Sequence, residues 1–318
     1  MSAPLVSMIV PIHNHEAFAV ETIESVCAQT HANLQIIVVD DGSTDNSLSI
    51  IREHFGERIT LIPQANGGPS AAVNAGLKAA KGEYIGLLGG DDVCEPDRVL
   101  HQIEILQSTQ HDIVFAPPTI IDTDGAVLPD SLVPVLYRKH EPGPSMFRQL
   151  FTNGNFLCAP SAMLRARTVQ VLGLFHEGLI ALQDYEYWIR ACSRGLSLAS
   201  FDHRVIRYRR HSQNLSSSLP VQATITECAY VLKRTLERAL PEIVRAAFPH
   251  VLPPTLNACA PLTLFEKVLL LTSHPLHDVR QTGLLSAIEL LDNEDERKAV
   301  AHHNVNLFQM LLSATHGR

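Results

Sequence analysis

Two pairs of adjacent carboxylates lie at positions predicted to be at the edge of a sheet, where they could bind a ligand or a metal ion. Each pair follows a short apolar segment with the composition of a buried strand. At the carboxyl edge of a parallel sheet, an Asp can accept hydrogen bonds from a ribose or a base, and neighbouring carboxylates suit Mg²⁺ or Mn²⁺. An acidic turn, with Ser43 or Thr44 capping the helix after the first pair, is the alternative. The pairs are Asp40 with Asp41 and Asp91 with Asp92.

A third carboxylate, Asp184, begins an aromatic segment with helical spacing. Tyr185 and Trp188 would lie on the buried face of that helix, and Glu186 could pair with Arg190 one turn later. A carboxylate held beside aromatic rings can act as a general base with a tuned pKa. An Asp in a first turn is also favoured as a cap and by the helix dipole, and both interpretations stay open.

Cations follow in residues 206–211, which read Ile-Arg-Tyr-Arg-Arg-His. Arg209 and Arg210 could bind phosphate, and His211 could be a metal ligand or contact a diphosphate. Along an exposed strand the same side chains would form a solvated face instead.

The elements that must position these residues alternate between strand and helix. Four short segments rich in Val, Ile and Leu predict strands buried on both faces, and segments with helical spacing separate them. This order predicts a parallel sheet wound by right-handed crossovers, with ligands beyond the carboxyl ends of its strands. The predicted strands are 6–12, 34–40, 59–63 and 84–88.

The rest of the chain is less regular. We expect a strand at 113–116, a turn at Asp124-Gly125, a loop over 129–144 and one strand over 198–209. The polar segment 216–220 would be a linker. Beyond it the spacing predicts helices only, with apolar faces at Leu284, Leu285, Ile288 and Leu291 and at Leu307, Leu311 and Leu312.

Composition excludes several classes of protein. The 318 residues are 46% hydrophobic and 18% charged, which is typical of a globular chain. The net charge of -8 argues against a nucleic-acid binder. No apolar run is long enough to cross a bilayer. The first 15 residues contain no Lys or Arg, so they lack the positively charged start that is typical of a secretory signal. Six dispersed cysteines suggest reduced thiols, so we expect a cytoplasmic protein.

Five motifs in order resemble the family-2 inverting nucleotide-sugar glycosyltransferases, whose catalytic domain has the GT-A fold. The similarity covers about residues 4–215. The matching stretches are Val6-Ser7-Met8-Ile9-Val10-Pro11-Ile12-His13-Asn14, Asp40-Asp41-Gly42-Ser43-Thr44-Asp45, the run from Asn66 to Gly76 with Ala80-Lys81-Gly82-Glu83-Tyr84-Ile85, Asp91-Asp92 with Pro96, and Gln183-Asp184-Tyr185-Glu186 with Tyr208-Arg209-Arg210-His211.

This resemblance implies a domain organisation and a reaction. It implies an α/β GT-A domain with a Rossmann-like mixed sheet over 1–219, and an all-helical region over 220–318 follows it. The nucleotide-binding half would be about 1–115 and the acceptor half about 116–219. The enzyme would move a sugar from a nucleotide-diphosphate sugar, with UDP-sugars the common donors, to an acceptor hydroxyl with inversion. Polysaccharide or glycoconjugate assembly is the common setting.

Roles carried over by position follow from the same resemblance. Pro11 and Ile12 would line the nucleotide pocket, and Asp41, with Asp40, would contact the base or ribose. Asp91 would hold the ribose edge, and Asp92 would be the direct ligand of Mg²⁺ or Mn²⁺, with His211 as a further candidate. Asp184 would be the catalytic base. Apart from the resemblance, the charge of Arg209 or Arg210 would stabilise the departing diphosphate.

Some positions depart from the family pattern. Gly89 stands where many members carry the first Asp of D-x-D, Val73 replaces a common Arg, Gln183 replaces a Glu, and His13 replaces a Tyr. Gly89, Val73 and Gln183 favour one alternative, a binding module that holds a nucleotide sugar without turnover, whereas the intact Asp92 and Asp184 oppose it. A dehydrogenase is excluded because His13-Asn14-His15-Glu16 occupies the place of the G-x-G-x-x-G loop, and no P-loop motif occurs.

The expected partners are the nucleotide-sugar donor and a carbohydrate or lipid-linked acceptor. The C-terminal helices could close over the acceptor, form a homodimer contact, or touch the inner face of the membrane peripherally. They show no strongly basic amphipathic face.

Overall fold

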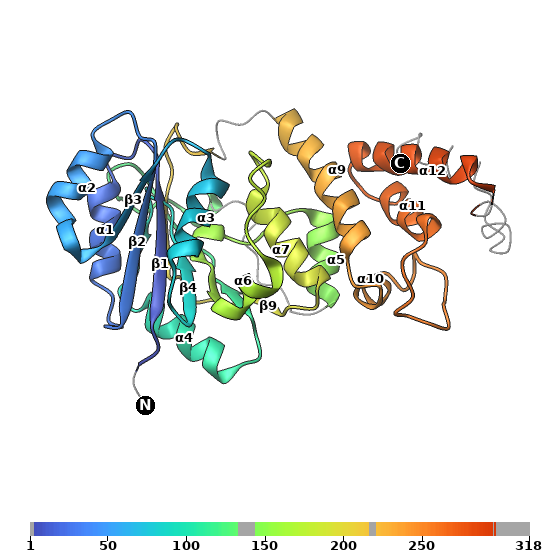
Figure 1. The fold of residues 1–318 in the computed structure, drawn as a ribbon, viewed down its shortest axis with the longest axis horizontal. Helices are drawn as coiled ribbons and strands as arrows, with labels where there is room; N and C mark the ends of the chain where they lie inside the picture. Colours follow the sequence, from blue (N-terminus) through green and yellow to red (C-terminus); the bar gives the residue numbers. More distant parts are fainter. Residues whose placement is uncertain (1–2, 133–143, 216–220, 295, 297–318) are drawn as a thin grey trace. The chain divides into compact units, whose positions relative to one another are not determined.

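A computed structural model describes residues 3–132, 144–215, 221–294 and 296 (Figure 1). The chain divides into two compact units. The first contains residues 1–142, 155–191 and 196–218, and the second contains 143–154, 192–195 and 219–318. Segment 216–220 and the predicted apolar face at Leu307, Leu311 and Leu312 lie outside the described residues, as do positions 133–143 of the predicted loop.

A seven-stranded mixed sheet forms the centre of the first unit. Its order is β3-β2-β1-β4-β8-β6-β9. Strands β3, β2, β1 and β4 are parallel, whereas β8 is antiparallel to both β4 and β6. The strands are β1 (Val6–Ile12), β2 (Leu34–Asp41), β3 (Thr60–Gln64), β4 (Tyr84–Leu87), β6 (Ile113–Phe115), β8 (Met163–Arg165) and β9 (Leu198–Ser200).

A second, three-stranded sheet has β10 in its centre. Strand β10 (Ile206–Arg209) pairs antiparallel with β5 (Val93–Cys94) and parallel with β7 (Thr119–Ile121). The pairing with β5 ties the segment after Asp91-Asp92 to the cationic segment. Two motifs more than one hundred residues apart in sequence are thereby brought together.

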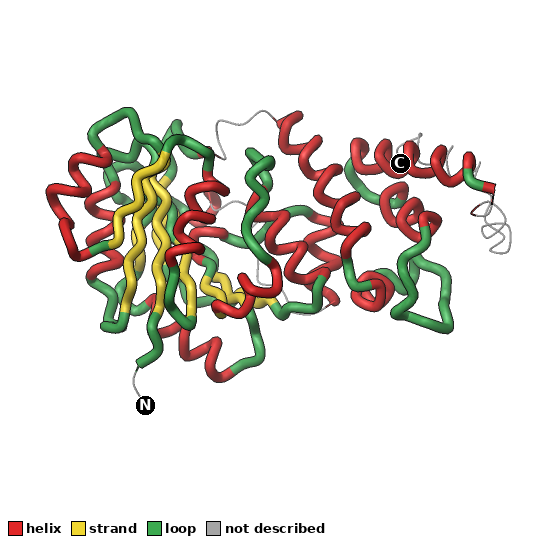
Figure 2. The backbone as a smooth tube through the Cα atoms, in the orientation of Figure 1, coloured by secondary structure: helices red, strands yellow, loops and turns green. Residues whose placement is uncertain are grey.

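Helices flank the large sheet, and short connections join them to the strands (Figures 1 and 2). The α-helices of the first unit are α1 (Ala19–Cys27), α2 (Ser47–Phe55), α3 (Pro69–Ala79), α4 (Arg98–Ser108), α6 (Ala166–Leu172) and most of α7 (Gln183–Ser193). Single 3₁₀ turns lie at Gly56–Arg58, Asp130–Leu132 and Ala159–Ser161.

The alternation of side chains along β1 explains how both faces of the sheet are covered. Met8 and Val10 join the core that contains residues of α1, α2 and α4. Ile9 points to the opposite face, where a Cβ atom on Gly76 of α3 would lie only 2.4 Å from its Cγ2. Because neighbouring side chains of a strand point to opposite faces, a continuous apolar strand needs helices on both sides.

The predicted parallel strands are confirmed, with two corrections elsewhere. Strand β3 is an edge strand whose residues are mostly half-buried, so the expectation that all four strands are buried on both faces was wrong for it. The single strand expected over 198–209 is two strands in different sheets. Residues 201–205 between them contain Asp202, a residue type that is depleted in strands, and the chain bends there.

The second unit consists of helices, and α5 from the middle of the chain belongs to it. A Thr263–Glu266 capping box starts α11. Helices α11 and α12 pack closely at Gly283, where a Cβ atom would lie only 2.7 Å from Thr272 N. Leu285 and Ile288 of α12 are 62% and 55% exposed. The helices are α5 (Pro144–Asn153), α9 (Val221–Arg238), α10 (Pro241–Ala247), α11 (Leu264–Thr272) and α12 (His277–Asp292).

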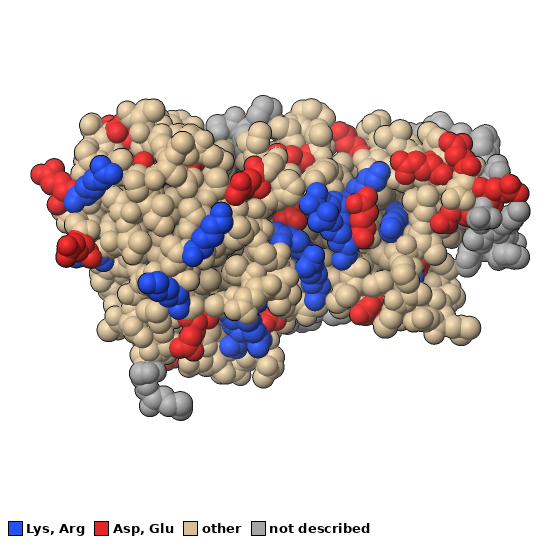
Figure 3. Space-filling model, viewed as in Figure 1, with Lys and Arg blue, Asp and Glu red and all other residues tan. Residues whose placement is uncertain are grey.

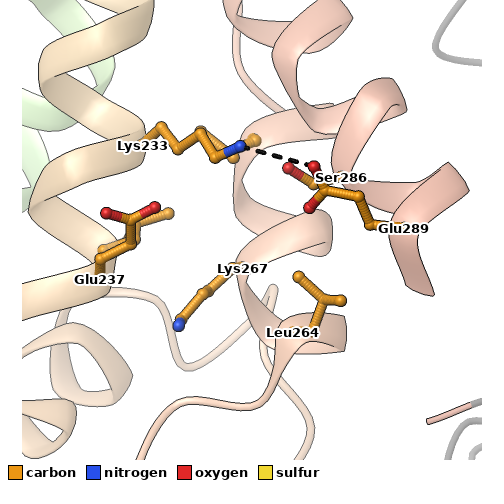
Figure 4. Close-up of a pocket in the computed structure, with 8 residues that line it drawn as sticks. Lys233, Glu237, Leu264, Lys267, Ser286 and Glu289 are labelled. Carbon is orange, nitrogen blue, oxygen red and sulfur yellow. Dashed lines mark ion pairs between the residues drawn. The ribbon is translucent and has the colours of Figure 1, made fainter. Parts of the chain in front are cut away.

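This helical unit contains a cavity of about 130 Å³ (Figure 4). Among the lining residues, Figure 4 marks one ion pair, between Lys233 Nζ and Glu289 Oε1 at 3.9 Å. None of the residues predicted to carry chemistry lines it. The lining residues are Lys233, Leu236, Glu237, Leu264, Lys267, Leu271, Ser286 and Glu289.

Surface and thiol chemistry agree with the expectations from composition. All six cysteines are free, and four of them are buried. On the face shown in Figure 3, acidic side chains are interspersed with Lys and Arg. Within the described part of the chain, no helix is long and apolar enough to span a membrane.

Candidate active site

The loop after β4 turns its two carboxylates toward different partners. Asp92 is only 1% exposed; its Oδ1 accepts the backbone N–H of Arg209 at 2.9 Å, and its buried Oδ2 has no partner among the described residues. Asp91 Oδ2 lies 2.9 Å from His211 Nε2 and accepts the Asn214 amide at 3.0 Å. Burial, and then the charge of Asp91, hold the pKa of Asp92 well above the usual carboxyl value.

Gly89 leaves the space into which both carboxylates turn. A Cβ atom on Gly89 would lie 2.6 Å from Asp92 Oδ2 and 2.9 Å from Asp91 Oδ1. An Asp at this position, as in the full D-x-D motif, would therefore displace the present arrangement. Because Gly89 has no side chain, the Asp92 carboxylate can turn into the space that a side chain at the first motif position would occupy.

Arg209 is committed to contacts within the protein. Its side chain is 1% exposed, and its guanidinium donates to the carbonyls of Asp91, Asp122 and Thr123 at 2.9–3.1 Å and to Glu21 Oε2 at 2.6 Å. Four of its five N–H groups are thereby used. This geometry favours a structural role and does not favour the predicted contact between Arg209 and a diphosphate.

The ring of His211 has a defined orientation. It stacks on Phe18 with a centroid distance of 5.2 Å, and its Nδ1 accepts the backbone N–H of Gln213 at 3.2 Å. A ring nitrogen that accepts carries no proton, so the neutral ring has its proton on Nε2 and donates it to Asp91. Metal ligation through Nε2 would require the proton to move to Nδ1, opposite another N–H.

His15 connects the loops after β1, β2 and β4. Its backbone N–H donates to Ser47 Oγ at 2.9 Å, and its ring meets that of His211 edge-on at 6.4 Å. A Cβ on Gly90 would lie 2.5 Å from its Nδ1, a buried atom with no partner among the described residues. Burial lowers the pKa of His15 despite the opposing effect of Asp91. These three loops therefore meet at one end of the sheet.

The carboxylates that end β2 are both buried. Asp41 Oδ1 accepts the Gln64 amide at 2.7 Å and the Gly67 N–H at 2.9 Å, and its Oδ2 accepts the Gly68 N–H at 2.8 Å. Asp41 thus holds the glycine loop before α3. Asp40 is 2% exposed, and its Oδ1 has no partner within the described structure.

The remaining predicted binding residues differ in how accessible they are. Pro11 is partly exposed near the carboxyl end of β1, whereas Ile12 is 1% exposed and belongs to the hydrophobic core. Arg210 has an exposed side chain, and its backbone N–H pairs with Ile121. Arg210 is therefore more accessible to an anionic ligand than Arg209.

Asp184 is the second residue of α7 and lies among many protein atoms, yet its side chain stays partly exposed. Its Oδ2 accepts the Asn155 amide at 2.7 Å, and its Oδ1 accepts the Tyr185 backbone N–H at 2.7 Å. Burial raises its pKa to about 6, and these two hydrogen bonds, with one from its own backbone N–H, oppose this rise. A carboxylate that titrates this close to neutral pH can accept a proton from a hydroxyl.

The helix that follows Asp184 agrees with the sequence pattern. Tyr185 and Trp188 are fully buried. Glu186 forms a two-bond ion pair with Arg190, at 2.8 and 2.9 Å.

The structure brings Asp91, Asp92, Arg209 and His211 into direct contact, but Asp184 has different partners. Helix α3 bonds to the segment that precedes α7, without contact to Asp184 itself. Ser70 Oγ donates to the His176 carbonyl at 3.1 Å, and Asn74 bonds to both backbone groups of Phe175, in the segment before α7.

Four residues of this region were missed by the sequence analysis. Asn214 could have been suspected from its position three residues after His211. Nothing in the local pattern marks Asn155, His15 or Glu21, because each acts through a residue distant in sequence.

Comparison with known proteins agrees with the predicted family. The model of the family "Glycosyl transferase family 2" matches residues 7–173. An uncharacterised glycosyltransferase of Rickettsia prowazekii is 35% identical over 225 residues, covering 68% of this chain and 67% of that protein. Chondroitin synthase of Escherichia coli is 30% identical over 219 residues, covering 67% of this chain and 30% of its own length. The chain likewise spans only 36% of a Rickettsia felis relative that is 32% identical.

Solved structures share the fold. TarS 1-349 of S. aureus, in complex with UDP-GlcNAc, superposes with a TM-score of 0.61 at 19% identity, covering 89% of this chain and 83% of that chain. The mannosyltransferase PcManGT of Pyrobaculum calidifontis, in complex with GDP-Man and Mn²⁺, gives a TM-score of 0.54 at 15% identity, covering 99% and 87%. The fold is therefore of the GT-A type, and the chain belongs to glycosyltransferase family 2.

Proposed function

We propose that the protein transfers a sugar from a nucleotide-diphosphate sugar to an acceptor hydroxyl with inversion of configuration. The observation that carries this proposal is Asp184, a partly exposed carboxylate with a pKa of about 6 and a hydrogen bond to each oxygen. Solved structures of the same fold contain UDP-GlcNAc or GDP-Man, which supports a nucleotide-sugar donor. A UDP-sugar and a role in polysaccharide or glycoconjugate assembly are our first choices.

The donor would bind where the loops after β1, β2 and β4 meet. Pro11 lies near the end of β1 and Asp40 and Asp41 end β2 there, with Asp41 shaping the site through the Gly67-Gly68 loop. Arg210 is the better candidate for the diphosphate because its side chain is exposed. In open α/β sheets ligands bind beyond the carboxyl ends of the strands, which agrees with this location.

A divalent cation fits this site in the space beside Gly89, between Asp91 and Asp92. Asp91 Oδ1 and the unpartnered Asp92 Oδ2 both turn into the space beside Gly89, and Mg²⁺ and Mn²⁺ prefer such oxygens. No group of three ligating side chains is arranged as a metal site in the described residues. One or two carboxylates suffice for Mg²⁺, which keeps waters and substrate phosphates as its other ligands. When bound, the cation would neutralise charge on the departing diphosphate.

Asp184 would accept the proton of the acceptor hydroxyl. The hydroxyl oxygen forms a bond to the anomeric carbon on the face opposite the nucleotide. The bond from that carbon to the diphosphate oxygen breaks, and its electron pair leaves with the nucleoside diphosphate. Attack from the opposite face inverts the configuration, and no second carboxylate is needed on the leaving-group side.

The alternative is a module that binds a nucleotide sugar without turnover. Gly89 favours it because the first carboxylate of the D-x-D motif is missing. Asp184→Asn separates the two functions. An enzyme would lose transfer and keep its donor affinity, whereas a binding module has no transfer to lose.

The proposal is tested first by measuring thermal stability with UDP-, GDP- and dTDP-sugars, each with and without Mn²⁺. We expect one nucleotide to raise the melting temperature more when Mn²⁺ is present. Transfer is then measured with that donor for the wild type and for Asp184→Asn. Equal activity of the two proteins would contradict the role of Asp184.

A further inference from the structure

The side-chain amide of Asn155 is held at both ends. Its Nδ2 donates to Asp184 Oδ2 at 2.7 Å, and its Oδ1 accepts the backbone N–H of Leu157 at 3.2 Å. Only the amide oxygen can accept that N–H, so the NH₂ group must face Asp184. Rotating the amide by half a turn would place donors against donors at Leu157 and would remove the hydrogen bond to Asp184.

The segment that carries Asn155 is anchored in the protein core. Phe156, Leu157 and Cys158 are 5%, 2% and 2% exposed, and the Cys158 carbonyl accepts the N–H of Ser161 at 3.0 Å. A donor on a buried segment keeps its place while a substrate binds. The amide is therefore a preorganised partner for a carboxylate 29 residues later in the chain.

We infer that Asn155 is a positioning residue for the base of the transfer reaction, which orients the Asp184 carboxylate and stabilises its ionised form. This inference rests on the proposed function of Asp184. Asn155 neither gains nor loses a proton. Its amide and the Tyr185 N–H each occupy one lone pair on a different oxygen, so the carboxylate cannot rotate and the remaining lone pairs face a defined direction.

Burial and hydrogen bonds alone act on Asp184 among the described residues. Burial raises its pKa; the Tyr185 N–H, the Asn155 amide and the backbone N–H of Asp184 itself lower it, and no charged side chain contributes. Because these bonds favour the ionised form, losing the amide would leave burial less opposed. The fraction of Asp184 that can accept a proton at neutral pH would then fall.

Two substitutions at Asn155 test this inference because they move the pH profile in opposite directions. Asn155→Leu has a similar shape and no donor, so the acid limb of kcat/KM should move up by about one to two pH units. Asn155→Asp places a second carboxyl against Asp184. Such a pair shares one proton, so the acid limb should move down and a new alkaline limb should appear as the shared proton leaves.

Asn74→Leu is the matched control. Asn74 is buried, and its amide bonds to the backbone of Phe175 at 2.8 and 3.0 Å, without contact to Asp184. This variant should lose stability while the acid limb of kcat/KM stays at the wild-type pH. Unfolding curves for every variant identify any loss of activity that comes from misfolding.

The results separate the inference from the proposed function. Acid limbs at the wild-type pH in both Asn155 variants would overturn the positioning role, even if the wild type transfers sugar and Asp184→Asn does not. A wild type without transfer, or an active Asp184→Asn, would overturn the proposed function. In that case the positioning role fails with it. A ¹³C-carboxyl titration would still test the contact between the two side chains. The Asp184 signal is the one that Asp184→Asn removes, and its titration midpoint should be higher in Asn155→Leu.

Discussion

Replacing Asp184 by Asn should make the folded protein more stable at neutral pH while removing its base. Burial raises the pKa of Asp184 from 3.8 to about 6, so the ionised carboxylate costs the folded state about 3 kcal/mol. Asparagine has the same shape and no charge. It offers one acceptor oxygen to the two donors, Asn155 and Tyr185, and losing one bond costs about 1–2 kcal/mol. We expect a net gain of about 1–2 kcal/mol above pH ~7.

The sign of the effect must change with pH. A carboxyl with a higher pKa in the folded state favours folding below its unfolded pKa of 3.8, and this contribution is lost as the pH rises through about 6. The Asp184→Asn variant has no carboxyl at this position, so its stability does not fall in this way as the pH rises. The difference in unfolding free energy between variant and wild type should therefore grow by up to about 1.4 kcal/mol per pH unit within that range. Near pH ~4 the variant should be the less stable protein.

Urea unfolding followed by Trp188 fluorescence measures this difference. Trp188 is the only tryptophan, is fully buried in α7, and packs edge-to-face against Phe115 at 4.8 Å. Asp45→Asn is the control with the opposite sign, because hydrogen bonds from Ser47 and Glu16 outweigh burial and lower the pKa of Asp45. That variant should lose stability at neutral pH. A gain for Asp184→Asn that is equal at pH ~5 and pH ~8 would refute the reasoning.

Four further changes have distinct expected outcomes. Arg209→Met should destabilise the first unit by about 3–5 kcal/mol in urea unfolding, because it leaves three carbonyls without their buried donor. Arg210→Met should change the stability by less than about 0.5 kcal/mol and weaken donor binding instead. Gly89→Ala should abolish any Mn²⁺-dependent rise in melting temperature, since its Cβ would displace the Asp91 and Asp92 carboxylates; an unchanged rise would contradict this. All six cysteines lie within the described residues, where Cys259 is exposed, Cys27 is half-buried and the others are buried, so one thiol should react rapidly with maleimide in the native protein and none in Cys259→Ser.

The parallel part of the sheet could be predicted because its information is local. The buried strands β1, β2 and β4 are short apolar runs followed by polar turns. Their bounds in the structure differ from the predicted ones by at most one residue. The half-exposed edge position of β3 could not be read from an apolar segment of the same kind. The division of 198–209 into β9 and β10 also depends on pairing partners, which lie in β6, β5 and β7.

The candidate site was only partly predictable for the same reason. The spacing of residues located Asp91 and Asp92 after a strand, but not which of them would turn inward. That choice depends on the backbone N–H of Arg209, 117 residues later. Likewise Asp184 was identified as a candidate base, whereas its partner Asn155 has no local signal.

Residue type and order alone therefore determined the family, the parallel strands and the carboxylates that end them, because alternation of apolar residues and polar turns acts over a few positions. Tertiary structure decided which atoms of those carboxylates are buried, bonded or open. Burial between distant segments raises the pKa of Asp184 to about 6 against the hydrogen bonds that lower it, and a hydrogen bond between distant segments turns Asp91 toward His211. These energies depend on distances of a few ångströms in space, and distance along the chain does not encode them.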